Sequence, residues 1–218
     1  MCGRSVARPG PWLRGLLGEW KVRRLLRRHG AEAMHDVLLP RPDGAGWTQV
    51  DHLVRLPDRI LVLETKNLGG RLRGAECDAC WTQAFGRRSF QIQNPLLQNA
   101  LHLAAVRTAA GRDVRLHGMV LLVGRGWVDD RLPMGCHRLG SFARQLRLLQ
   151  RRDRFGPTWE SRVAGAWQRI QEATSTRLRD RLHHEAAIAR RRGRRPRLAP
   201  GLGLALAGGA LLGLFLAG

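Results

Sequence analysis

Two neighbouring stretches in the first third of the chain carry side chains that can bind metal and transfer protons. Asp51 lies in one apolar stretch, and Glu64 and Lys66 end the next. If the two stretches form an antiparallel hairpin about Pro57-Asp58, Asp51 lies opposite Glu64. Side chains alternate along a strand, so Lys66 lies on the same face as Glu64. The sequence therefore predicts two carboxylates and an ammonium group at one place.

This combination favours phosphodiester chemistry. Two carboxylates opposed across neighbouring strands repel each other unless a divalent cation or a proton lies between them. A bound Mg²⁺ or Mn²⁺ polarises a phosphate and lowers the pKa of a water molecule, while a lysine positions or deprotonates the nucleophile. Short acid-x-Lys strings also occur by chance, so the alternative is a surface hairpin with a Glu–Lys ion pair.

Periodicity and turn residues predict the elements that must position these groups. The expected helices cover residues 13–29, 95–110 and 141–150, with a long amphipathic stretch at 158–192. The expected strands cover residues 36–39, 47–55, 60–66 and 114–123.

Glu19 is the candidate acid of the first helix. It shares a helical stripe with Leu16, Val22 and Leu26. An unpaired carboxylate on an apolar stripe is unfavourable, which favours a metal or a cationic partner. The alternative is that Glu19 reaches solvent beside Arg23.

Two polar residues lie on one face of the helix that Asn94 is expected to cap. Gln98 and His102 are four residues apart, and each suits either phosphate binding or a polar contact at the sheet edge. We assign Gln98 to function and His102 to the core. His52 follows Asp51 directly and is expected to point to the opposite sheet face, away from the metal.

Taken in order, these residues resemble the nuclease-related domain (NERD) family, a branch of the PD-(D/E)xK nuclease superfamily. The resemblance covers residues 13 to 123 and rests on Gly18-Glu19, Gln49-Val50-Asp51-His52, Glu64-Thr65-Lys66-Asn67, Gly70, Trp81, Asn94-Pro95, Gln98 and His102.

The resemblance implies an α/β fold with a restriction-endonuclease-like core, in which helices flank a mixed four-stranded sheet. It also implies metal-dependent nuclease activity. Carried over by position, Asp51, Glu64 and Glu19 are the metal ligands, Lys66 is the catalytic lysine, and Gln98 is the helix-borne polar group beside the site.

Charge indicates the class of partner. The 218 residues include 38 Lys and Arg against 17 Asp and Glu, a net charge of +21, and this favours a nucleic acid or an anionic membrane surface. Arginine outnumbers lysine strongly, so part of the charge reflects compositional bias. Residues 141–197 contain 16 Arg and five acids, so about half of the surplus lies there.

The C-terminal residues 198–218 contain no charged or polar side chain and directly follow the basic cluster 190–197. About 20 apolar residues span a bilayer, so we expect a C-terminal transmembrane helix with the body of the protein on the cytoplasmic side. The alternative is an apolar tail folded onto the domain.

Cys77, Cys80, Cys136 and His137 resemble a zinc ligand set only in part. Adjacent ligands such as Cys136 and His137 rarely reach one tetrahedral ion, so we do not expect zinc.

The sequence thus divides into five segments: a tail at 1–12, the nuclease-like domain at 13–125, a linker and Arg-rich segment at 126–157, a basic helical region at 158–197 and the transmembrane tail at 198–218. We predict a Mg²⁺- or Mn²⁺-dependent endonuclease that cleaves DNA at the cytoplasmic face of a membrane. The alternatives are an inactive nucleic-acid-binding or membrane-surface adaptor with the same fold, and a nuclease that acts on RNA.

Overall fold

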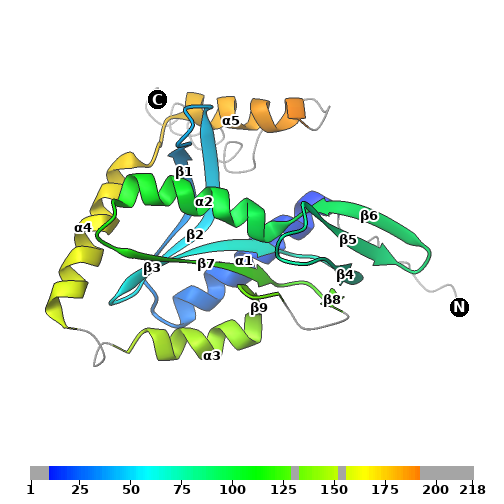
Figure 1. The fold of residues 1–218 in the computed structure, drawn as a ribbon, viewed down its shortest axis with the longest axis horizontal. Coiled ribbons are helices and arrows are strands. Elements are labelled where there is room, and N and C mark those ends of the chain that lie inside the picture. Colours follow the sequence, from blue (N-terminus) through cyan, green and yellow to red (C-terminus); the bar gives the residue numbers. More distant parts are fainter. Residues whose placement is uncertain (1–9, 129–132, 152–155, 192–218) are drawn as a thin grey trace, which may run out of the picture.

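The structure is a computed structural model that describes residues 10–128, 133–151 and 156–191. It contains both helices and strands, with six consecutive strands between the first two helices and three consecutive helices at its end (Figure 1). The helices are α1 (Pro11–Arg28), α2 (Pro95–Ala110), α3 (Leu139–Leu149), α4 (Pro157–Ala173) and α5 (Leu178–Arg191). The strands are β1 (Ala33–Pro40), β2 (Trp47–Arg55), β3 (Arg59–Lys66), β4 (Arg71–Arg73), β5 (Cys80–Phe85), β6 (Arg88–Gln93), β7 (Arg115–Leu122), β8 (Trp127–Val128) and β9 (Cys136–Arg138).

The main sheet is mixed and has the strand order β1-β2-β3-β7-β9. β1, β2 and β3 pair antiparallel, whereas β3 pairs parallel with β7, and β7 with β9. The predicted mixed α/β fold is confirmed, but the sheet has five strands and not four. The additional strand β9 has three residues, too few for alternation to identify a strand from sequence.

Helices cover both faces of the main sheet. The central strand β3 needs cover on both faces, because its side chains alternate between them and are apolar on each. Ile60 and Val62 of β3 belong to the core formed with α2 and α4, whereas Leu61 and Leu63 belong to the core formed with α1 and α3. Figure 1 shows α2 on the near side of the sheet and α1 on the far side. Parts of the segments 126–157 and 158–197 therefore pack against the same sheet as the nuclease-like domain.

Asn94 caps α2, as predicted, and also attaches the neighbouring sheet to it. Its Oδ1 accepts a hydrogen bond from Leu96 N at 2.9 Å. Its Nδ2 donates to the carbonyls of Ala75, Glu76 and Asp78. The first turn of α2 is thereby fixed in place, which positions the polar residues that follow it.

A second sheet, with the order β6-β5-β4-β8, was not predicted. Its paired strands β5 and β6 project from one end of the molecule (Figure 1). Leu72 and Trp81, each 1% exposed, pack with Val120 and Leu122 of the main sheet. Most other residues of β5 and β6 are exposed or half-buried, so they lack the apolar alternation that reveals a strand.

The predicted amphipathic stretch at 158–192 is two helices, α4 and α5, separated at residues 174–177. α5 lies against the β1–β2 end of the sheet, where Arg181 binds Asp36 and His184 Nδ1 lies 3.0 Å from the carbonyl oxygen of Trp47. Among the described residues, no helix is long and apolar enough to cross a membrane. The predicted transmembrane segment 198–218 lies outside these residues.

Candidate active site

The β2–β3 hairpin brings the predicted carboxylates together. The register pairs His52 with Leu63, as predicted, and the next position along each strand holds Asp51 and Glu64. Asp51 Oδ2 accepts a hydrogen bond from the backbone N–H of Thr65 at 2.7 Å. The edge where β2 and β3 separate therefore carries both acids.

Glu64 is the centre of a network formed by β3, α2 and β2. It is 2% exposed, and its Oε1 lies 2.5 Å from Lys66 Nζ. Its Oε2 lies 3.1 Å from His102 Nε2, and the other ring nitrogen of His102 lies 2.9 Å from Thr48 Oγ1. Lys66 Nζ also donates to Gln98 Oε1 at 2.9 Å. Both oxygens of Glu64 and the ammonium group of Lys66 are thereby held in fixed positions.

The pKa values of the two carboxylates shift in opposite directions because their surroundings differ. Burial raises the pKa of Glu64, but the ammonium of Lys66 and the hydrogen bond from His102 outweigh it and hold the pKa below its usual value. Burial, followed by the nearby charge of Glu64, raises the pKa of Asp51 well above its usual value, despite the bond from Thr65. The surroundings therefore stabilise the charged form of Glu64 and oppose that of Asp51.

Glu19 reaches this edge from α1 because the helix packs closely against the end of β3. A Cβ atom at Gly18 would lie 2.9 Å from Asn67 Cβ and 3.4 Å from Thr65 Cγ2. Asn67 Nδ2 in turn donates to the carbonyl of Arg14 at 2.6 Å. Glycine at position 18 thus permits the approach, and Asn67 holds the helix there.

The charges around Glu19 link it to the same cluster. Burial raises its pKa, Arg23 lowers it, and the carboxylates of Asp36 and Glu64 raise it further. Glu19 is half-buried, and Arg23, which the sequence offers as its neighbour on the helix, is among the charges that act on it. Its role as a metal ligand stays a prediction.

The pairing of β1 with β2 is interrupted opposite Asp51. The pairing passes from His35–His52 to Val37–Val50 and skips Asp36 and Asp51, and Asp36 has a left-handed φ of 57°. The Asp36 carboxylate accepts hydrogen bonds from Gln49 Nε2 and from Arg181. A left-handed φ at a residue other than glycine is uncommon and is often found at functional sites.

Sequence reasoning missed two members of this site. His102 is buried, as expected, but it contacts Glu64, and its four-residue spacing from Gln98 was the available signal. Asp36 was predicted only as the first residue of a strand. The available signal was that Val50 and Leu53 of the paired strand hold apolar positions three apart, which breaks strict alternation.

The oxygen donors of this edge suit a hard cation. Asp51 and Glu64 offer carboxylate oxygens, and Mg²⁺ in proteins takes one or two carboxylates plus water and substrate phosphates. Within the described part of the chain, no three His, Cys, Asp or Glu side chains converge closely enough to hold a metal ion. Cys77 and Cys80 are exposed, and Cys136 is buried.

Comparison with known proteins agrees with this geometry. Residues 14–123, just over half of the chain, match the nuclease-related domain family, and this segment contains every predicted site residue. An uncharacterized protein of Bacillus anthracis is 35% identical over 99 residues, which cover 44% of this chain and 46% of that protein. The match thus spans about half the length of this curated relative. No solved structure matches the chain significantly. The family match shows that the chain belongs to the nuclease-related domain (NERD) family.

Proposed function

We propose that the protein is a divalent-metal-dependent nuclease that hydrolyses phosphodiester bonds in DNA. The observation that carries this proposal is the fixed cluster of Asp51, Glu64 and Lys66 at one edge of the sheet. Membership of the nuclease-related domain family supports a hydrolase of this class. The net charge of +21 supports a polyanionic substrate.

Asp51 and Glu64 would hold the cation, with Glu19 near enough to contribute charge. When bound, a divalent cation supplies positive charge that polarises a phosphate and lowers the pKa of water. The fit rests on the chemistry of the donors: burial and the charge of Glu64 both raise the pKa of Asp51, so a cation beside the two carboxylates would stabilise the charged form of Asp51. A cation at this edge would relieve that repulsion.

The chain's own residues position the reacting groups. Gln98 holds the ammonium of Lys66 at 2.9 Å, so Lys66 can present a proton donor and a positive charge to a phosphate at the same edge. His102 fixes the second oxygen of Glu64, which restricts rotation of the carboxylate. In this proposal Lys66 acts on the substrate, whereas Gln98 and His102 are positioning residues.

The membrane tether belongs to the same proposal. It rests on the apolar segment 198–218 and the basic cluster 190–197 in the sequence. A tether would hold the nuclease at the cytoplasmic face of a membrane. Fractionation of cells that express the full chain, compared with a chain that ends at residue 197, tests this part: recovery of both forms in the soluble fraction would contradict it.

A plasmid-nicking assay of the full chain tests the enzyme. We expect cleavage with Mg²⁺ or Mn²⁺, none in EDTA, and loss of cleavage in Lys66→Ala. Lys21→Ala is the matched control, because Lys21 is the other lysine of the chain, is exposed on α1 and makes the same change in charge. Asp51→Asn should abolish both cleavage and the rise in melting temperature on addition of Mn²⁺.

The same assay separates the alternatives. An inactive adaptor would bind nucleic acid in a salt-sensitive way, cleave neither DNA nor RNA, and bind unchanged in Lys66→Ala. A ribonuclease would cleave a single-stranded RNA and leave the plasmid intact. Either result would refute the proposed activity on DNA.

A further inference from the structure

A surface groove of about 420 Å³ lies between α1 and the start of β1. We call it the α1 groove. Its charged and aromatic lining consists of Trp20, Arg23, Arg24, Arg27 and His35. Its volume falls in the ~300–1,000 Å³ range of small-molecule sites.

The charge of the groove favours an anion. α1 carries six basic residues and one acid, Glu19, and three of its arginines line the groove. Arg23, which lines the groove, lies one helical turn beyond Glu19 on α1, so the groove extends along the helix from the turn that carries the candidate acid. A phosphate chain that leaves the active site along α1 would meet Arg24 and Arg27 next.

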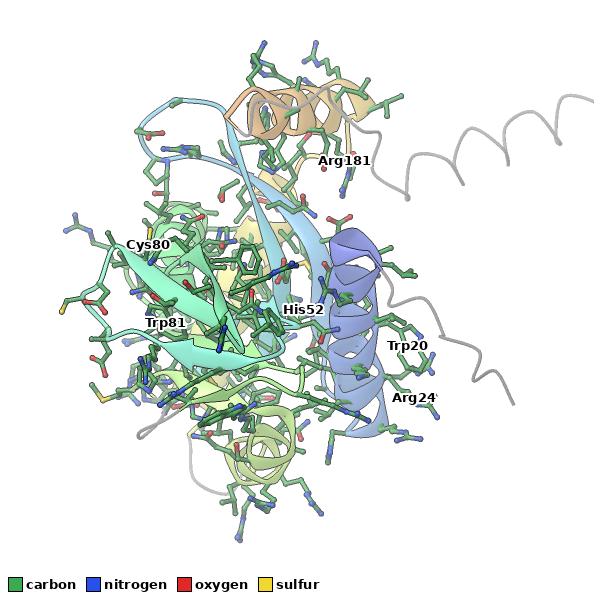
Figure 2. The ribbon with its side chains drawn as sticks, turned by 90° about the vertical axis from the view of Figure 1, so that its right-hand side faces the viewer. Trp20, Arg24, His52, Cys80, Trp81 and Arg181 are labelled. Carbon is green, nitrogen blue, oxygen red and sulfur yellow. The ribbon has the colours of Figure 1, made fainter. Side chains whose placement is uncertain are left out.

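Trp20 offers a surface for an aromatic ring. It is 53% exposed, and the guanidinium of Arg24 lies 5.2 Å from the centre of its ring. Figure 2 shows Trp20 and Arg24 projecting from the same side of α1. Exposed tryptophans beside arginines are stacking platforms for the bases of single-stranded nucleic acids.

The remaining walls suit a base more than a second phosphate. Leu26, Ala31 and Ala33 line the groove with apolar surface. His35 is fixed by its contact with the buried His52, whose Nδ1 lies 3.0 Å from that of His35. The groove thus has an apolar, aromatic part that suits a nucleobase and an arginine-rich part that suits a phosphate.

We propose that the α1 groove binds one unpaired nucleotide next to the scissile phosphate, with its base on Trp20 and its phosphate on Arg24 and Arg27. An unpaired base leaves its stack to reach a tryptophan at lower cost than a paired base, so the groove favours single-stranded segments. The choice of nucleic acid as ligand rests on the proposed nuclease function.

Fluorescence anisotropy of the full chain in EDTA tests the groove without cleavage. The probes are a fluorescein-labelled oligothymidylate and a duplex of the same length. We expect the single strand to bind Trp20→Ala at least about fivefold more weakly than the parent chain, and Trp20→Phe to recover part of the loss. The melting temperature of each variant shows whether it is folded.

Trp127→Ala is the matched control. Trp127 is also 53% exposed, and Arg71 also lies 5.2 Å from its ring centre, but it lies on β8 outside the groove. Equal losses in Trp20→Ala and Trp127→Ala, or no loss in Trp20→Ala, would overturn the proposal. Failure of the parent chain to bind the single strand more tightly than the duplex would also overturn it.

Salt dependence provides a second measurement. Arg27→Ala should make the slope of log Kd against log salt shallower by about 0.7, the value for one lost phosphate contact on a single strand. Arg28→Ala, next to it on α1 and outside the groove lining, should leave the slope unchanged. Equal changes would indicate general attraction to the basic helix and would refute a defined site.

The outcomes separate this inference from the proposed function. If Trp20→Ala binds like the parent chain and still cleaves, only the groove assignment fails. If the parent chain binds single strands through Trp20 but cleaves no nucleic acid, the groove stands and the nuclease proposal fails.

Discussion

Replacing Gly18 by alanine tests how closely α1 must approach the active-site edge. Within a helix, alanine in place of glycine stabilises the protein by ~0.5–1 kcal/mol. At position 18, however, the new Cβ would lie 2.9 Å from Asn67 Cβ. Asn67 cannot move aside freely, because its Nδ2 is bonded to the carbonyl of Arg14. The helix or the end of β3 must shift.

Overpacking of this kind costs ~1–3 kcal/mol, which exceeds the gain in helix propensity. Gly15→Ala is the matched control on the same helix, since nothing lies within 4 Å of its added Cβ. We expect Gly15→Ala to raise the free energy of unfolding and Gly18→Ala to lower it, with a difference of roughly 1–3 kcal/mol between the two variants.

Urea unfolding of both variants measures this difference. Because Gly18 precedes Glu19 and Asn67 follows Lys66, the shift should also reduce metal-dependent cleavage by Gly18→Ala, on the order of tenfold. Gly15→Ala should cleave like the parent chain. If Gly18→Ala is stabilised as much as Gly15→Ala, the close approach of α1 to β3 does not limit the packing, and the reasoning is refuted.

Four further substitutions test the site and the core. Lys66→Met should lower the free energy of unfolding by about 3 kcal/mol at neutral pH, because the buried Glu64 loses its cation. The loss should be smaller under acid conditions, because the stabilisation from the lowered pKa of Glu64 is complete above the usual value of 4.5 and disappears as the pH falls through the folded-state pKa. A pH-independent loss in urea unfolding would contradict this. Asp51→Asn should raise the melting temperature of the metal-free protein at neutral pH, because the raised pKa of Asp51 means that its charge opposes folding there. This gain should shrink as the pH falls and the native carboxyl group becomes protonated. A lower melting temperature in Asp51→Asn at neutral pH would contradict the argument. Asn99→Ala should reduce the free energy of unfolding by about 1–3 kcal/mol, because its Nδ2 donates to two strand carbonyls at 3.1 and 3.2 Å; urea unfolding without loss would show those bonds to be dispensable. Trp167→Ala should cost about 3–5 kcal/mol in the same assay, since this side chain is 4% exposed in the core between α4 and the sheet; a negligible loss would mean that α4 is not part of the core.

Sequence alone predicted the elements whose signals are local. Apolar alternation predicted β2 over residues 47–55, and Asn94 before proline predicted the start of α2. The hairpin register followed from the short turn between β2 and β3, because such a turn leaves few ways to pair the strands. The adjacency of Asp51, Glu64 and Lys66 could therefore be predicted without a structure.

Contacts between distant segments could not be predicted in this way. The contact of His102 with Glu64 joins residues 38 positions apart, and the contact of Arg181 with Asp36 joins residues 145 positions apart. The second sheet was also missed, since its strands bury few side chains and depend on pairing with one another for their structure.

Residue types and their spacing are enough to tell which chemical groups the chain carries and which of them share a strand or a helix face, because these relations depend on periodicity over a few residues. How the groups meet depends on the packing of the whole fold. The left-handed turn of Asp36, the close packing of Gly18 on Asn67 and the placement of His102 against Glu64 depend on how α1, α2 and the sheet fit together. Each of these contacts forms only when elements that are far apart in the sequence pack against one another, so it cannot be read from local sequence patterns.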